Sequence, residues 1–461
     1  MKERVLQTLR DLRAYALKSG VEITLFYQEE DSYLMRIANS AVSLNTNEHL
    51  IRLEITAYEG KKRASYNLIT DLDKVGDMKK GVDIAAELVQ HAQPLTYQPT
   101  VPIFGESYED ESGADDELAR MGNHEKLVYY NKAVEGLESN EIRLSGIFSH
   151  GLNTMAQINT RSEHTQFFRS SDALVTAVLS HERLKWEVTS EQSVHGKAEL
   201  DPGIIHRELA FLVECYQKET PLQLPLGSYD IVFGYNAIGD LVNFMNYIAF
   251  SGGMMKRGYS FLSEDKIGQK VLSEKFTLAD DPEQAQTFPL KRDFMGIPRH
   301  RFPIFEKGVF QGFTWSQDDA DEFGARPTGH TVNHKSICLQ AGDRMVDSLE
   351  SLVSMPRERD TLYIPFLHYM NIVNPSKGIV TGSSRFGTLL LRKDGTIAIP
   401  YNVRITQSLL DIFGEKVAWF STSMIPTNKS ISYGARNPTA MIVPTFMLVK
   451  ELEISHSNES F

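Results

Sequence analysis

The chain is poor in cysteine and in long apolar runs. Its two cysteines, Cys215 and Cys338, cannot form a disulfide framework across 461 residues and suit a reducing compartment. No stretch reaches the ~18 apolar residues of a membrane-spanning helix. The first twenty residues carry charges throughout, where a signal peptide has an apolar core. These absences predict a cytoplasmic protein with no membrane partner.

Positive charge is also in short supply. The chain has 48 basic and 60 acidic side chains, a formal net charge of −12. Such a surface repels phosphate backbones, which disfavours direct nucleic-acid binding. The best cationic segment, 291–301, contains Pro and Gly, and we interpret it as a loop that neutralises the protein's own acids.

Common catalytic motifs are missing. Residues 253–260 have the glycine spacing of a phosphate-binding loop, but Tyr259 stands where its lysine belongs. No G-x-S-x-G or C-x-x-C occurs. His330 and His334 have the spacing of two zinc ligands on a helix, yet the preceding Pro and Gly and the intervening β-branched residues argue against a helix there. We therefore favour turn and hydrogen-bond roles for both histidines over metal binding.

Hydrophobic periodicity indicates alternating helices and half-buried antiparallel strands in the N-terminal half. The first group comprises a helix at 3–19, strands at 21–27, 33–38 and 50–58, and a helix at 79–92. The second group comprises a helix at 116–138, strands at 141–149, 153–159, 173–180 and 184–189, and a helix at 203–217. The second group repeats the order of the first, which is consistent with a duplication.

Between and after these groups the composition changes. Residues 93–115 are acidic and rich in proline, as in a solvated linker. From residue 223 onward Gly, Pro and β-branched residues dominate, apart from one helix expected at 236–250. The sequence thus predicts an α+β protein with domains at 1–92, 116–222 and 223–461, the last of them strand-rich.

Several segments of the last domain, in order, resemble the TldD/PmbA (TldE) family, whose members were once called modulators of DNA gyrase. The similar segments are FSGG…KRGYSFL (250–262), DKIGQKV (265–271), DDP (280–282), PTGH (327–330), KDGTIAIP (393–400) and IT…LLD (405–411). Together they span more than 150 residues. The N-terminal half agrees with the family in its order of elements.

The resemblance implies that the expected helix at 236–250 corresponds to the one that holds zinc in TldD, the metallopeptidase of the family, through an H-E-x-x-x-H motif. In this chain Tyr235 and Asp240 occupy the two ligand positions and Asn236 occupies the position of the general base. An amide cannot accept a proton near neutral pH, and Tyr is a rare zinc ligand. We therefore expect no catalytic residue and no metal site here, as in TldE-like members.

The resemblance further implies a non-catalytic, peptide-binding subunit of a TldD/TldE-type complex that degrades or matures small proteins. Zinc would reside in a TldD-like partner subunit. Self-association into a dimer is the other form of assembly. An exposed strand edge would bind unfolded peptide. One alternative is a stand-alone metallopeptidase that uses His330, His334 and Asp240 as a divergent metal site. Another is a regulatory protein without a peptidase role.

Overall fold

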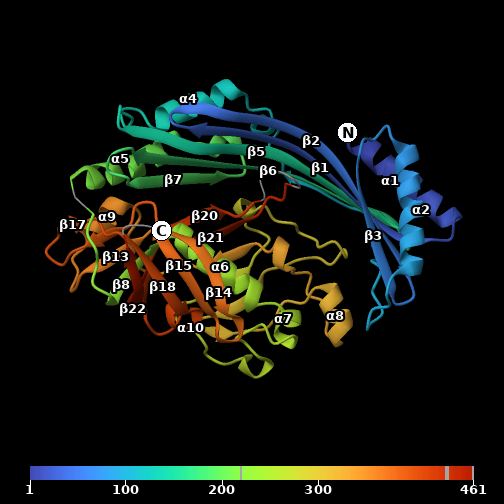
Figure 1. The fold of residues 1–461 in the computed structure, drawn as a ribbon. Helices are drawn as coiled ribbons and strands as arrows, with labels where there is room; N and C mark the ends of the chain where they lie inside the picture. The colour runs from blue at the N-terminus through green and yellow to red at the C-terminus, as the bar shows by residue number, and fades with distance from the viewer. Residues whose placement is uncertain (219–220, 431–435, 459–461) are drawn as a thin grey trace.

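A long curved sheet forms the N-terminal half of the molecule and arches over the C-terminal half (Figure 1). The computed structural model describes residues 1–218, 221–430 and 436–458. The sheet has the order β3-β2-β1-β5-β6-β4, and β7 also pairs with β6. Its strands are β1 (Glu22–Ala38), β2 (Ala41–Glu59), β3 (Lys62–Thr70), β4 (Tyr108–Gly113), β5 (Ile142–Asn159), β6 (Ser162–His181) and β7 (Glu187–Val194). The helices of this half are α1 (Lys2–Lys18), α2 (Val75–His91), α3 (Asp116–Ala119), α4 (Asn123–Ala133) and α5 (Pro202–Lys218).

The strands are antiparallel as predicted, but they are longer. β1 is continuous where the sequence predicted two short strands, because its polar middle pairs on both sides. Asp31, for example, lies opposite His49 of β2 and Leu152 of β5. β5 is likewise one strand where two were predicted. Two neighbouring ladders satisfy the backbone of these polar stretches, which side-chain periodicity does not reveal.

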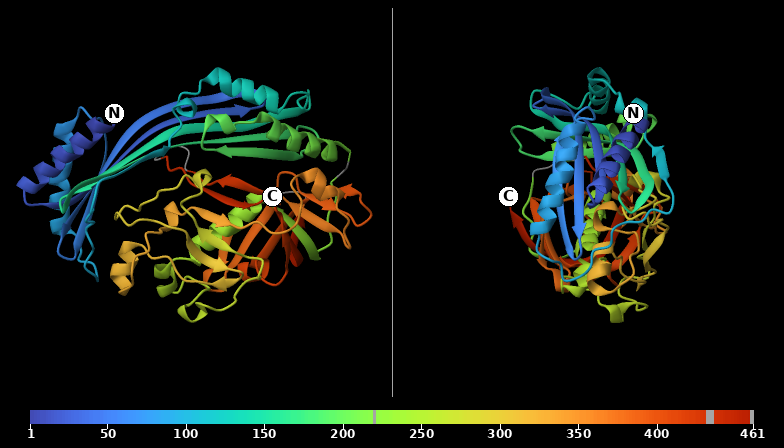
Figure 2. Two further views of the ribbon diagram at one scale, coloured as in Figure 1. Left: turned by 180° about the vertical axis from the view of Figure 1, so that it is seen from behind. Right: turned by 90° about the vertical axis from the view of Figure 1, so that its right-hand side faces the viewer.

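Helices cover the outer face of the arch at both ends (Figure 2). At one end α1 and α2 pack on Leu25 and Tyr27 of β1, and at the other end α4 packs on Met35 and Ile37 of the same strand. Because these residues lie an even number of positions apart, they share one face of the sheet. The middle of that face, around Glu29 and Asp31, lies between the two helical layers.

The order of elements repeats within this half. The series α1-β1-β2-β3-α2 is followed by α4-β5-β6-β7-α5, and the two sets of strands join through the antiparallel pair β1–β5. The predicted ranges 1–92 and 116–222 therefore contribute to one sheet. The domain boundaries placed at residues 92, 115 and 222 stay predictions.

Two local expectations were wrong. Part of the acidic segment 93–115 is the strand β4, which pairs in parallel with β6, so this segment is not linker throughout. The helix predicted over 116–138 is instead the pair α3 and α4, with Gly122 as the N-cap of α4. Glycine interrupts a helix at low cost in this position because its backbone is extended there.

The C-terminal half consists of two sheets that enclose α6 (Tyr235–Ile248), in agreement with the predicted α+β class and strand-rich last domain. One sheet has the order β11-β10-β9-β12-β21-β20, and the other has the order β14-β15-β18-β22-β8-β13-β16-β17 with β19 paired to β22. The strands are β8 (Gly227–Gly234), β9 (Leu278–Asp280), β10 (Phe302–Glu306), β11 (Val309–Phe310), β12 (Ile337–Leu339), β13 (Thr361–Ile364), β14 (Phe366–Asn374), β15 (Ile379–Arg385), β16 (Leu389–Leu391), β17 (Ile397–Ala398), β18 (Asn402–Ser408), β19 (Val417–Phe420), β20 (Met424–Asn428), β21 (Ala440–Pro444) and β22 (Phe446–Asn458). The remaining helices are α7 (Gly252–Lys256), α8 (Gln317–Phe323), α9 (Leu349–Ser354) and α10 (Leu409–Ile412). Within the described ranges, none of the helices has the length and apolarity needed to cross a bilayer.

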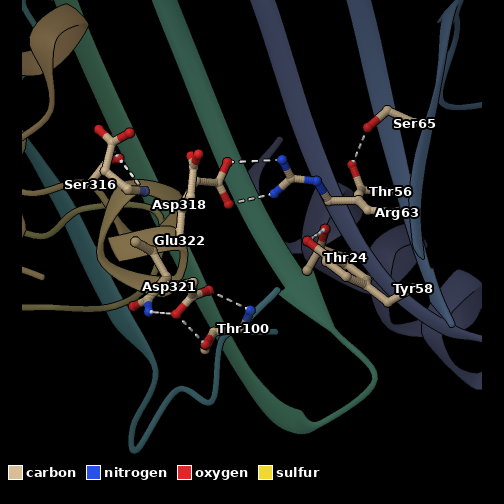
Figure 3. A network of polar contacts seen from close by, with 12 residues as sticks. Thr24, Thr56, Tyr58, Arg63, Ser65, Thr100, Ser316, Asp318, Asp321 and Glu322 are labelled. Carbon is tan, nitrogen blue, oxygen red and sulfur yellow. Dashed lines mark hydrogen bonds and ion pairs between the residues drawn. The ribbon is translucent and has the colours of Figure 1, made fainter. Parts of the chain in front are cut away.

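Polar contacts tie the arch to the C-terminal half at several places, which include the far tip and the middle of the arch. At the far tip, Arg63 of β3 forms two hydrogen bonds of 2.6 and 2.9 Å with Asp318 of α8 (Figure 3). Beside it, Thr100 donates two hydrogen bonds to Asp321 (Figure 3). Under the middle of the arch, the fully buried Arg436 forms an ion pair of 2.7 Å with Asp172 of β6.

The basic run at 291–301 is confirmed as a loop that neutralises the protein's own acids. Its four ion pairs are Lys291–Glu283, Arg292–Glu106, Arg299–Asp280 and Arg301–Glu306. All four acids belong to the same chain, so this segment has little free positive charge to offer a phosphate backbone.

Candidate functional site

The first turn of α6 lies at a crowded junction directly after β8. Gly234 is the N-cap, and a Cβ atom at this position would lie 3.1 Å from the backbone of Pro365. At Gly239 a Cβ atom would lie 2.5 Å from Cγ2 of Thr427 in β20. Both glycines are therefore needed for close packing, and they hold the motif positions 235, 236 and 240 between neighbouring strands.

The three motif positions all engage side chains or backbone of this same chain. Tyr235 is buried, and its hydroxyl donates to the backbone carbonyl of Glu191 in β7 at 3.3 Å. The carboxamide oxygen of Asn236 accepts a hydrogen bond of 3.1 Å from Thr427. Asp240 forms an ion pair of 2.5 Å with Lys429, which follows β20. The start of α6 is thus closed by β7 of the arch and by β20 of the C-terminal half.

Two further carboxyl groups surround this turn. Burial raises the pKa of Glu191 to about 7, with Asp240 and Glu208 adding to the rise and Lys429 opposing it. Burial likewise raises the pKa of Glu208 in α5 to about 7, although a hydrogen bond of 2.6 Å from Ser190 acts in the opposite direction. Near neutral pH both groups can therefore exchange protons, a behaviour that clusters at functional sites.

Zinc does not fit the side chains present at positions 235, 236 and 240. The Tyr235 hydroxyl is protonated, because it donates to a carbonyl oxygen, and a protonated hydroxyl is no zinc ligand. The ammonium group of Lys429 already neutralises Asp240 and would repel a cation. The buried Nδ2 atom of Asn236 has no hydrogen-bond partner among the described residues. The side chains at the start of α6 therefore contact other groups of the protein, and the positive charge beside Asp240 is that of Lys429.

His330 and His334 lie in other surroundings. Nδ1 of His330 lies 2.6 Å from Asp280, which also pairs with Arg299 at 2.8 Å and accepts from the backbone of Ser336. His334 ends a 3₁₀ turn, and its ring packs edge-on against Phe294. Burial lowers the pKa of His334 to about 4, so it is neutral at physiological pH.

These contacts also join two of the segments that carry the family resemblance. Asp280 comes from the DDP segment and His330 from the PTGH segment, 50 residues later. The side chains of both are almost fully buried, at 0% and 3% exposed. We interpret the two segments as parts of one structural network. Across the described ranges, one group of three side chains could hold a metal ion, namely Glu29, Asp31 and His49, and it includes none of the predicted site residues.

Sequence reasoning missed Glu191, Glu208 and Lys429. None lies in a segment with a recognisable motif, and Lys429 is 189 positions from Asp240. Only the packing of β7, α5 and β20 around α6 brings these residues together. Glu208 lies in the predicted helix at 203–217 and Glu191 just after the predicted strand at 184–189, and an ionisable residue in such a place is too common to identify a site.

Residues 226–456 match the sequence profile described as the PmbA/TldA metallopeptidase C-terminal domain. No curated protein matches the chain by sequence.

Among solved structures, TldE from Thermococcus kodakarensis is similar with a TM-score of 0.80 and 17% identity, over 97% of this chain and 100% of that one. A protein from Thermotoga maritima, described as a candidate modulator of a DNA gyrase, has a TM-score of 0.73 and 16% identity over 97% and 99% of the two chains. A similarly described protein from Bacteroides thetaiotaomicron has a TM-score of 0.73 and 16% identity over 97% and 98%. At this identity the structural likeness establishes the fold along almost the entire chain.

Proposed function

The chain belongs to the TldD/PmbA metallopeptidase family, and on that premise we propose that it is a non-catalytic, peptide-binding subunit of a TldD/TldE-type peptidase complex in the cytoplasm. The observation that carries the proposal is the ion pair between Asp240 and Lys429 at the family's metal position. A lysine ammonium supplies one positive charge to the surrounding carboxyl groups, yet it cannot polarise a carbonyl group or activate water as zinc does. The frame of the peptidase persists while its water-activating group is replaced.

The strand beside this position supports a peptide-binding role. β14 lies at the edge of its sheet, and its outer edge has no strand partner among the described residues. Tyr369 and Val373 on β14 are 64% and 56% exposed. His368 of the same strand lies near enough to Asp240 for that carboxylate to influence its pKa. An extended peptide could pair with such an edge through main-chain hydrogen bonds, which would give low sequence specificity.

We propose a TldD-like subunit as the partner, and zinc as the cofactor of that subunit. Self-association into a dimer is the alternative assembly. In either case an unfolded peptide is the substrate class, and the products are shorter peptides. The deciding experiment is to co-purify the full chain with the TldD-like protein of its host and to assay cleavage of an unfolded peptide. Cleavage that requires both chains supports the proposal.

The same assay distinguishes the alternatives. Cleavage by this chain alone, abolished by a chelator and restored by zinc, would overturn the proposal and favour a stand-alone metallopeptidase. For the edge strand, Val373→Lys should lower cleavage by the complex, because a bulky charge next to the edge hinders pairing. Ile69→Lys is the matched control, since Ile69 is 69% exposed on β3, an edge strand of the N-terminal sheet.

A further inference from the structure

A side-chain cluster on the outer face of the arch is separate from the start of α6. Glu29 and Asp31 are two positions apart on β1 and therefore point to the same face, and His49 of β2 lies directly opposite Asp31. This is the part of the face between the helical layer of α1 and α2 and the layer of α4. The ligand atoms of the three side chains all lie within 4.8 Å of one another.

Each side chain of the cluster is oriented by a different contact. Nδ1 of His49 lies 2.7 Å from Oδ1 of Asp31, and this contact raises the pKa of the imidazole. When the ring is neutral, Nδ1 keeps the proton and the lone pair is on Nε2. The Tyr27 hydroxyl donates to Oε2 of Glu29 at 2.7 Å. That leaves Oε1 of Glu29, which lies 3.7 Å from Nε2 of His49. The two free donor atoms therefore face each other.

This separation is close to what one shared metal ion requires. Zinc binds imidazole nitrogen and carboxylate oxygen at about 2.0–2.2 Å, which in tetrahedral geometry places the two ligand atoms roughly 3.4 Å apart. The observed 3.7 Å needs a shift of a few tenths of an ångström. Asp31 then corresponds to the carboxylate that accepts a hydrogen bond from the second ring nitrogen of a metal-binding histidine and so fixes the orientation of the ring.

Burial and charge add an independent argument. The side chain of Glu29 is only 6% exposed, and within the described chain Oε1 accepts no hydrogen bond besides its approach to His49. A buried carboxylate of this kind is stabilised by a positive charge, which a metal ion bound at Nε2 of His49 would supply in place of the proton on that ring. Asp71 adds a further negative charge near His49. Arg4, whose charge acts on Tyr27, pairs with Asp73. The side chain of His49 is 55% exposed, so solvent and ions can reach the site.

We propose that Glu29 and His49 bind a divalent transition-metal ion, with Zn²⁺ as the probe, and that Asp31 positions the imidazole. Two protein ligands leave the remaining coordination positions to water, so the ion exchanges readily. Imidazole favours Zn²⁺ over Mg²⁺, which prefers an all-oxygen environment. The site does not depend on the function proposed above, and it lies on rigid neighbouring strands, as a preorganised site requires.

The test is a Zn²⁺ titration of the full chain after chelator treatment, by calorimetry and by the shift of the melting temperature. The wild type should bind one ion at this site and melt at a higher temperature with Zn²⁺, and excess Mg²⁺ should not compete. His49→Ala and Glu29→Gln should each weaken binding tenfold or more. Asp31→Asn should weaken it about 10–100-fold, because it acts on the orientation and basicity of the ligand.

His124→Ala is the matched control, since it also removes an exposed imidazole and should leave the affinity unchanged. Unchanged Zn²⁺ affinity and melting shift in His49→Ala would overturn the proposal, as would the absence of Zn²⁺ binding by the wild type. An Asp240→Asn variant separates this inference from the question of peptidase function. Loss of zinc in Asp240→Asn but not in His49→Ala would place the ion at α6, which would refute both the site proposed here and the non-catalytic role.

Discussion

Asp280 is fully buried, whereas Glu191 and Glu208 near the start of α6 are partly exposed, and the pKa values of the two sets are shifted in opposite directions. Although burial opposes ionisation, Arg299 and His330 hold the pKa of Asp280 below its usual range. At α6, burial prevails and raises the pKa of Glu191 and Glu208 to about 7. The difference lies in the partners: Asp280 accepts from Arg299, His330 and the backbone of Ser336, whereas Asp240 and Glu191 share Lys429 and Glu208 has a hydrogen bond from Ser190.

The two clusters therefore differ in role within one fold. The Asp280 network joins segments that carry the family resemblance, and its job is to hold the frame together. The α6 cluster contains carboxyl groups whose pKa values are raised by burial. The start of α6 is therefore an electrostatically unusual site, in which Lys429 pairs with Asp240.

The largest expected effect comes from breaking the compensated network. Arg299→Met should lower the free energy of unfolding by about 3–5 kcal/mol at pH 7, because it leaves the Asp280 carboxylate buried without its main partner. Chemical denaturation measures the change. Arg301→Met is the control, since its pair with Glu306 is 3.4 Å long and both side chains are at least 40% exposed. A loss below about 1 kcal/mol for Arg299→Met would show that the network is not structural.

The second effect is a loss of stability with rising pH, which arises from Glu208 near the start of α6. The pKa of Glu208 is about 7 in the folded state and about 4.5 as a free side chain, so the folded state holds its proton longer than the unfolded state. Glu208 therefore costs stability progressively as the pH rises from about 4.5 to 7. Glu208→Gln should be more stable than the wild type at pH 8, by up to about 3 kcal/mol, and equal to it at pH 4.

Unfolding midpoints at pH 4, 6 and 8 test this expectation. The exposed Glu138→Gln provides the control, for which we expect parallel pH profiles of variant and wild type. A stability gain for Glu208→Gln that is the same at all three pH values would contradict a titration of this group. The Asp280 network predicts the reverse trend, since the stability from its ionised carboxylate is lost as the pH falls through its lowered pKa.

A smaller effect should follow from removing the cation at α6. Lys429→Met should lower the free energy of unfolding by about 1–2 kcal/mol, because the pair with Asp240 is partly exposed, at 17% and 29%. Since Lys429 opposes the rise in the pKa of Glu191, the variant should also move that pKa further upward. A double-mutant cycle with Asp240→Asn measures the coupling, and Lys270→Met, from an exposed pair with Glu415, is the control. An additive cycle would mean that the lysine does not stabilise the site.

Several helices could be predicted from the sequence, whereas the long strands could not, and both outcomes have physical reasons. The periodic helices were placed within a few residues, because α1 and α6 each carry an apolar stripe. The resemblance predicted that positions 235, 236 and 240 correspond to a metal motif, and this stays a prediction; the structure places the three residues in the first two turns of α6. The long strands were missed, because the polar centres of β1 and β5 break the alternation on which the prediction rested.

The partners at both clusters were out of reach for a different reason. Glu191 lies in β7 and Lys429 follows β20, and only tertiary packing brings them to Tyr235 and Asp240. Glu29 and His49 likewise become a pair through the register between β1 and β2. Local patterns identify elements and motifs, whereas the charges that decide what a site can do came from residues up to 189 positions away.

The smallest expected effect concerns the phenol at the first motif position. Tyr235→Phe removes only a hydroxyl whose hydrogen bond to the backbone of Glu191 is long, at 3.3 Å, so the free energy of unfolding should fall by about 0.5–1 kcal/mol. The buried ring stays in place, and the stoichiometry of bound zinc should not change, because the hydroxyl is not a ligand. Elemental analysis together with denaturation tests both statements. A loss of zinc in Tyr235→Phe without unfolding would show that the phenol coordinates a metal. It would then contradict the proposal that the start of α6 has no metal site.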